Sequence, residues 1–223
     1  YLVISVIGLV WAFNFRVKVR SLPFLFHSAL FVASEYLFIQ LFFIQKFSRI
    51  YEGLILLALV GFVFVGTYVS FLMTNVFNVN LYKKIPLVNV ARTTSYIIST
   101  LTVFFLFFGI LALQLPLYIL LPILIAVAYF LSFIHLKNLG YEGMLLNRRS
   151  LLVSAIVIFM FISTLFSGVL HEVSVLAPVV GYFVGIGVAN IKLENKGKTF
   201  ELFLYILILI AVVLINFRLN IFI

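Results

Sequence analysis

Residues 23–45 read PFLFHSALFVASEYLFIQLFFIQ, an almost unbroken apolar run. About 20 apolar residues are enough for a helix to cross the hydrocarbon core of a bilayer. A half-buried strand would instead alternate apolar and polar residues. The stretch therefore predicts a transmembrane helix, and its one charged residue, Glu35, is the first candidate for a functional group.

The composition of the whole chain indicates the same class of protein. Of 223 residues, 65% are hydrophobic and 9% are charged, whereas soluble domains are about half apolar and a quarter charged. The chain contains no cysteine and no aspartate, which excludes disulfides, thiolate metal sites, cysteine nucleophiles and aspartate chemistry. The net charge of +9 is assigned to basic loops at the cytoplasmic face and not to a nucleic-acid partner.

Eight apolar runs divide the chain into predicted membrane spans. They cover about residues 1–14, 23–45, 53–79, 93–113, 115–136, 151–171, 173–191 and 201–217. The first is short for a span, and we interpret it as the remainder of a longer helix. The predicted fold is all-α, a polytopic transmembrane helix bundle of about eight transmembrane helices in a single domain, residues 1–223.

Basic residues are distributed unevenly between the two sets of loops. Twelve follow the odd-numbered runs: Arg16, Lys18, Arg20, Lys83, Lys84, Arg92, Lys137, Arg148, Arg149, Lys192, Lys196 and Lys198. Three follow the even-numbered runs: Lys46, Arg49 and Arg218. Cytoplasmic loops are the basic ones, so both termini are expected outside the cytoplasm. We expect a multi-pass protein of the cell membrane, the prokaryotic plasma membrane rather than the mitochondrial inner membrane.

Glu35 lies near the centre of its run. A charged side chain that faces lipid at this depth costs about 2.5–3.5 kcal/mol on insertion scales, so we expect its carboxyl to be protonated, paired, or turned toward protein or water. Ser28, seven residues earlier, lies on nearly the same helix face, and Ser34 is adjacent. One interpretation is a proton-linked group that faces lipid or another subunit, and the other is a structural hydrogen bond inside the bundle.

Small residues form a stripe in the seventh run. Ala177, Gly181, Gly185 and Ala189 recur every four residues and so share one helix face. Small side chains let helix backbones approach closely in membranes. The stripe predicts a helix-packing seam, and a groove that lines a substrate path is the alternative.

The histidines suggest a further site. His27 begins one run and His135 ends another, so both are expected near the cytoplasmic face. Two imidazoles at one depth on neighbouring helices are the arrangement that binds haem b. The alternative is a pair of interfacial histidines bonded to loop carbonyls, and His171 with Glu172 is interpreted as a polar turn.

Other polar residues gather in the third run and in the loop after it. Lys83, Lys84 and Arg92 are expected to mark the level of the lipid headgroups. The side chains that either line a cavity between the third and fourth runs or link neighbouring helices by hydrogen bonds are Thr67, Ser70, Thr74 and Asn75.

The second run resembles a helix of subunit III of haem–copper oxidases, the cytochrome c and quinol oxidases. That helix has the form L-F-x-x-S-E-x-x-F followed by further phenylalanines, and its glutamate-bearing helix runs from inside to outside, as the charge count also requires here. The resemblance covers residues 24–114, and the later runs lack the histidine and tryptophan motifs of the family. The matching residues are Leu30, Phe31, Ser34, Glu35 and Phe38, then Phe42 and Phe43.

The resemblance implies a non-catalytic subunit of a respiratory electron-transfer complex. Such a subunit packs against the catalytic oxidase core, contacts structural lipids, and carries a buried glutamate linked to proton uptake or to stability of the pump. We expect no cofactor bound by this chain itself. The alternatives are a transporter or permease subunit that uses Glu35 as its proton-coupling group, and a haem b subunit that uses His27 and His135.

Overall fold

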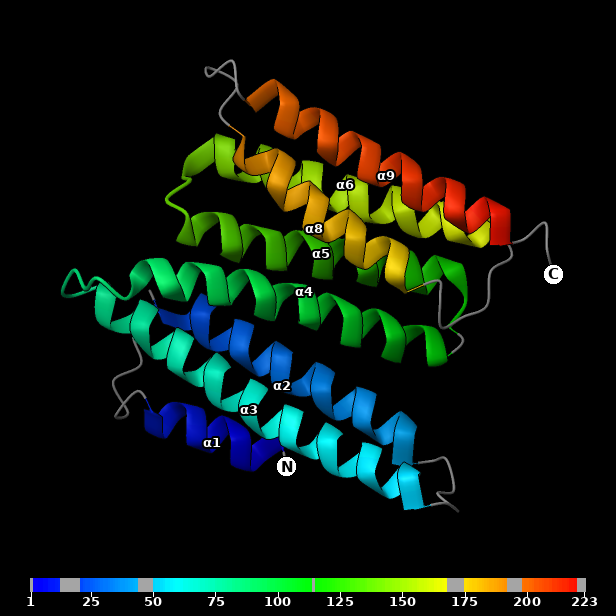
Figure 1. Ribbon diagram of the computed structural model, residues 1–223. Helices are drawn as coiled ribbons and strands as arrows, with labels where there is room; N and C mark the ends of the chain where they lie inside the picture. The colour runs from blue at the N-terminus through cyan, green and yellow to red at the C-terminus, as the bar shows by residue number, and fades with distance from the viewer. Residues whose placement is uncertain are drawn as a thin grey trace. The chain divides into compact units, whose positions relative to one another are not determined.

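The computed structural model describes residues 2–12, 21–43, 50–113, 115–167, 175–191 and 198–219. Within these ranges every extended regular element is an α-helix, and no strand occurs (Figure 1). The helices are α1 (Leu2–Ala12), α2 (Leu22–Phe43), α3 (Ile50–Asn80), α4 (Val88–Ala112), α5 (Leu117–Asn138), α6 (Gly143–Ser167), α8 (Leu176–Asn190) and α9 (Lys198–Leu219).

Five of these helices are long and apolar enough to cross a membrane. The candidate spanning segments are Leu22–Leu41, Gly53–Asn80, Val88–Ala112, Leu117–Asn138 and Gly143–Leu165. The apolar parts of α8 and α9, Leu176–Asn190 and Phe200–Leu214, are shorter, and α1 has 11 residues. The prediction of an all-helical fold is therefore confirmed, and five helices are suited to a membrane.

Two helices, α4 and α6, begin much earlier than their predicted spans. α4 begins at Val88 instead of 93, and α6 begins at Gly143 instead of 151. The expected boundaries followed the basic residues, but Arg92, Arg148 and Arg149 lie inside helices. Long basic side chains reach the membrane surface from within a helix, so a charge does not end the helical hydrogen bonding. The turn before α6 contains Gly140 at φ 92°, and α6 itself begins at Gly143, which has φ 60°.

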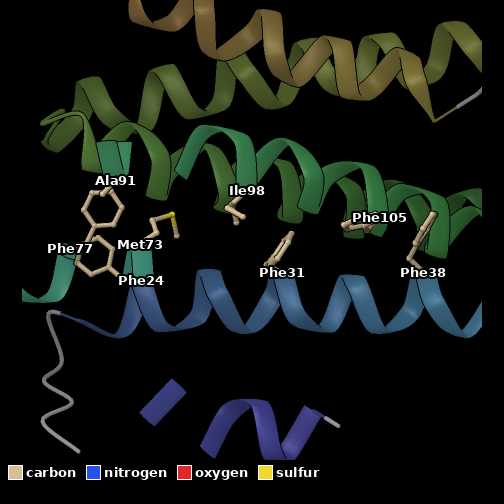
Figure 2. Close-up of a cluster of buried hydrophobic side chains, with 8 residues drawn as sticks. All are labelled: Phe24, Phe31, Phe38, Met73, Phe77, Ala91, Ile98 and Phe105. Carbon is tan, nitrogen blue, oxygen red and sulfur yellow. The ribbon is translucent and has the colours of Figure 1, made fainter. Parts of the chain in front are cut away.

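The chain divides into two compact units, residues 1–109 and 110–223, and the single membrane domain stays a prediction. In the first unit α2 packs along α3, and α1 contacts both helices. Figure 2 shows its phenylalanine core, to which α2 contributes a side chain every seven residues. The core consists of Phe24, Phe31, Phe38, Met73, Phe77, Ala91, Ile98 and Phe105.

Aromatic contacts join the three helices of this core. The ring centroids of Phe38 and Phe105 are 4.8 Å apart, and those of Phe24 and Phe77 are 5.3 Å apart. Aromatic pairs at such distances add to the stability that burial alone provides. The core therefore determines which face of α2 is turned toward α3 and α4.

In the second unit the small-residue stripe of α8 faces α6. Its four members are all buried. A Cβ atom added to Gly185 would lie 3.1 Å from Val153 Cγ1 and 3.4 Å from Val153 Cα, so the two backbones approach closely at this point. A Cβ on Gly181 would lie 3.0 Å from Met160 Cγ. The stripe thus supplies a contact surface between two helices.

A polar clamp holds the C-terminal end of α8. Arg149 of α6 donates a hydrogen bond to the Ala189 carbonyl oxygen, and its guanidinium carbon lies 4.2 Å from the centroid of the Tyr141 ring. The Tyr141 hydroxyl donates to Asn190 Oδ1 at 3.0 Å. Basic side chains are favourable near the last carbonyls of a helix, so Arg149 links α6 to the end of α8.

Candidate functional site

Glu35 lies on the face of α2 that is turned toward α3, and its side chain is fully buried. Thr67 Oγ1 donates a hydrogen bond to Glu35 Oε2 at 2.9 Å. Oε1 has no hydrogen-bond partner among the residues that the structure describes. The two carboxyl oxygens are therefore in different environments, one bonded and one bare.

Gly66 makes room for the bare oxygen. A Cβ atom at this position would lie 2.6 Å from Glu35 Oε1 and 3.2 Å from Phe31 Cζ. Any larger residue on α3 would therefore have to displace the carboxyl. Sequence reasoning did not single out Gly66. Its position directly before Thr67, in a run already noted for small and polar residues, was the available signal.

Hydroxyl groups extend the contact along the same two helices. Ser70 Oγ donates to Ser28 Oγ at 2.7 Å, and Ser28 Oγ is 3.0 Å from the Ser70 carbonyl oxygen. The Ser28 and Thr74 hydroxyls also form a hydrogen bond. We call Ser28, Glu35, Thr67, Ser70 and Thr74 the polar seam. Its members recur at helical spacing on each helix, and all of them except Thr67 are fully buried.

The polar seam shows that three hydroxyl groups of α3 link neighbouring helices by hydrogen bonds. It does not include two residues that the sequence suggested, Asn75 and Ser34. The hydroxyls of Thr67, Ser70 and Thr74 link α3 to α2, and Asn75 is half-buried outside the seam. Ser34 is buried, but its hydroxyl donates to the Phe31 carbonyl oxygen of its own helix at 2.6 Å. Ser34 therefore does not bond to its neighbour Glu35.

The two histidines proposed for haem belong to different units. His27 on α2 is fully buried, and its Nε2 is 2.9 Å from Ser99 Oγ of α4. His135 is buried on α5 of the second unit. Nε2 of His27 would have to leave Ser99 before it could bind a haem iron. Over the described ranges no three histidine, aspartate or glutamate side chains gather as metal ligands, and His171 and Glu172 lie outside those ranges.

The basic residues assigned to the headgroup level surround the turn after α3. Lys83 and Lys84 are exposed in this turn, and Arg92 is half-exposed in α4. Arg92 Nη1 donates to Asn89 Oδ1 at 3.4 Å. These side chains are therefore available to solvent or to lipid headgroups at one end of the α3–α4 pair.

Comparison of the chain with family models, curated proteins and solved structures finds no match. The geometry alone therefore defines the site. It is a carboxyl group inside a helix that is long and apolar enough to cross a membrane, fixed through one oxygen by a threonine of the next helix. Ionisable groups inside apolar helices of this kind are candidate functional sites, and Glu35 is the candidate here.

Proposed function

We propose that this chain is a non-catalytic membrane subunit of a respiratory electron-transfer complex, similar to subunit III of haem–copper oxidases, and that Glu35 is its proton-binding group. One observation carries the proposal. The Glu35 carboxyl is fully buried in α2, with Oε2 bonded to Thr67 and Oε1 bare. In the protonated state we place the proton on Oε1, because Oε2 already accepts from Thr67.

The polar seam supports a route for this proton. Thr67, Ser70 and Thr74 follow one another along α3 toward the turn that carries Lys83 and Lys84. At 1.5 Å per residue, the seven residues from Thr67 to Thr74 span roughly 10 Å. Hydroxyl groups both donate and accept, and Ser70, Ser28 and Thr74 bond to one another. In this proposal the proton on Oε1 reaches the hydroxyls after the carboxyl rotates toward Thr67, which bonds to Oε2 in the structure. The basic turn is the cytoplasmic end of the route under the charge rule.

The arrangement of the oxidase-like motif also supports the proposal. Phe31, Ser34, Glu35 and Phe38 recur at helical spacing and are all buried. Two of these residues belong to the phenylalanine core in Figure 2. The motif therefore combines a packing surface with one protonatable group, which is what the proposed subunit requires.

The first test combines isolation of the complex with the variant Glu35→Gln. Glutamine keeps the shape of the protonated acid and accepts from Thr67, so we expect insertion and stability within about 1 kcal/mol of the wild type, the scale of one hydrogen bond in a membrane bundle. After mild detergent extraction the wild-type chain is expected to retain a haem-containing oxidase core. The variant should retain the same core but translocate fewer protons per electron.

The matched control is Glu142→Gln, because Glu142 is exposed and lies outside the seam. It should leave proton translocation unchanged. Isolation without any oxidase core would contradict the assignment to a respiratory complex. Disappearance of Glu35→Gln from the membrane would show that the carboxyl has a structural role instead.

A proton-coupled carrier is the second candidate. Carriers commonly move two helix bundles against each other around a central site, and this chain forms two compact units of similar length, residues 1–109 and 110–223. In this case purified protein alone, reconstituted in liposomes, should transport a solute when a proton gradient is applied. Glu35→Gln should abolish that transport, whereas a subunit of a respiratory complex would show none.

We also propose the eight-span topology with both termini outside the cytoplasm. The chain has no cysteine, so single-cysteine variants can be labelled without background. Tyr118 and Lys83 are exposed at opposite ends of this topology. An impermeant maleimide added to intact cells should label Tyr118→Cys, and it should label Lys83→Cys only after permeabilisation. The reverse pattern would overturn the orientation.

A further inference from the structure

An apolar groove runs between α3 and α4 in the first unit. Its volume is about 120 Å³. Met73 and Ala91 are buried at its base and belong to the phenylalanine core (Figure 2), whereas Leu72, Leu87 and Val90 are exposed along its sides. The lining residues are Val69, Leu72, Met73, Val76, Leu87, Val90, Ala91 and Thr94.

The groove presents almost no polar group. Thr94 is the one polar side chain in its lining, and its hydroxyl donates to the Val90 carbonyl oxygen of its own helix at 2.9 Å. No hydrogen-bonding ligand would therefore gain partners there. An apolar groove beside a membrane helix is suited to a hydrocarbon chain, which fills the space between side chains by van der Waals contact.

Positive charge lies at the end of the groove where α3 and α4 are joined. The connecting turn is short, because the Lys83 amide donates to the Val79 carbonyl oxygen at 3.0 Å and the Val88 amide donates to the Ile85 carbonyl oxygen at 3.4 Å. Lys83 and Lys84 are exposed in this turn, four and three residues from Leu87 in the groove wall. Among the side chains described in the first unit, Glu35 is the one acid, and it is buried in the polar seam.

From this placement we propose that the groove binds a segment of one acyl chain of an anionic phospholipid whose phosphate is held by Lys83 and Lys84. Basic residues next to apolar membrane surface attract anionic headgroups, and the groove accommodates the segment of the chain nearest to them. Lysines just after a helix also interact favourably with its C-terminal dipole, but that role requires no lipid. The proposal is independent of the function proposed for Glu35.

The test measures thermal unfolding of the full chain in a neutral detergent with added lipid. A ligand at about 100 times its Kd should raise Tm by about 5–10 °C for a chain of this size. Phosphatidylglycerol should produce this rise, phosphatidylcholine with the same acyl chains a smaller one, and inorganic phosphate none. In the double variant Lys83→Gln/Lys84→Gln, the difference in Tm rise between phosphatidylglycerol and phosphatidylcholine should fall to less than half of its wild-type value.

Two further variants separate the groove from general charge effects. Val76→Phe would fill the groove and should weaken the response to both lipids, whereas Val60→Phe on the exposed face of α3 should not. Lys137→Gln, an exposed lysine of the second unit, should keep the lipid difference. If a variant is too unstable for Tm measurement, native mass spectrometry counts the lipids bound per chain and compares lipid binding with that of the wild type.

Three results would overturn the proposal. One is an unchanged lipid difference in the double lysine variant. A second is an equal Tm rise with inorganic phosphate, because charge alone would then explain the effect. The third is an equal loss of bound lipid in Val60→Phe and Val76→Phe, because the groove would then have no special role.

Discussion

Gly185→Leu is expected to destabilise the second unit by about 3 kcal/mol or more, the upper part of the range for overpacked interiors. The reason is the close approach of α8 to α6. A Cβ at this position would lie 3.1 Å from Val153 Cγ1 and 3.4 Å from Val153 Cα, and the second of these atoms belongs to the backbone. A leucine side chain therefore requires the helices to separate. At about 2–4 °C per kcal/mol for a chain of this length, Tm should fall by about 6–12 °C.

Gly61→Leu is the matched control, since a Cβ at Gly61 meets nothing within 4 Å. This variant should be neutral or slightly stabilising, because leucine favours helix over glycine by roughly 0.5–1 kcal/mol. The milder pair Gly185→Ala and Val153→Ala should be coupled, with the double variant more stable than the sum of the two single changes predicts. Equal Tm values for Gly185→Leu and Gly61→Leu would show that the α6–α8 contact does not need the glycine.

Gly66→Ala is expected to destabilise the first unit by about 1–3 kcal/mol and to disturb the candidate site directly. The added Cβ would lie 2.6 Å from Glu35 Oε1. Phe31 Cζ is 3.2 Å from the same position, so the added methyl crowds a second buried side chain as well. Rotation would also break the 2.9 Å hydrogen bond from Thr67. Unfolding in detergent, followed by loss of helical circular dichroism, measures the change in Tm.

The companion variant is Glu35→Ala, which removes the group that the new methyl would meet. Gly66→Ala should therefore cost less in the Glu35→Ala background than in the wild type, and this coupling identifies the contact. Gly61→Ala again serves as the control and should not lower Tm. If Gly66→Ala lowered Tm equally with and without the Glu35 carboxyl, Gly66 would not be needed to make room for Oε1.

The same variant bears on the proposed function. In Gly66→Ala the carboxyl group is displaced but still present. In Glu35→Gln an amide replaces the carboxyl and keeps its position in the polar seam. A proton-binding role predicts that Glu35→Gln loses proton transfer with little loss of stability. A structural role predicts the opposite order, with the larger effect in stability. The two variants together separate these roles.

The sequence by itself determined the class of protein. Long apolar runs are a local property, and only a helix satisfies its own backbone hydrogen bonds in lipid, so the helical membrane fold followed without knowledge of any contact. Helix ends were predicted less well, because the arginines at the start of α4 and α6 were interpreted as loop residues. Glu35 was also identified from the sequence alone, because a charged side chain in the middle of an apolar run has a high free-energy cost in lipid.

Only the tertiary structure decided what each helix face meets. Helical spacing shows that Thr67, Ser70 and Thr74 share a face, but it does not show that this face meets α2, with Ser28 and Glu35 opposite. The division into two units and the pairing of Gly66 with Oε1 were equally absent from the sequence pattern. The physical reason is that these features depend on packing between residues far apart in the chain, where many apolar faces are equally compatible with the same local periodicity.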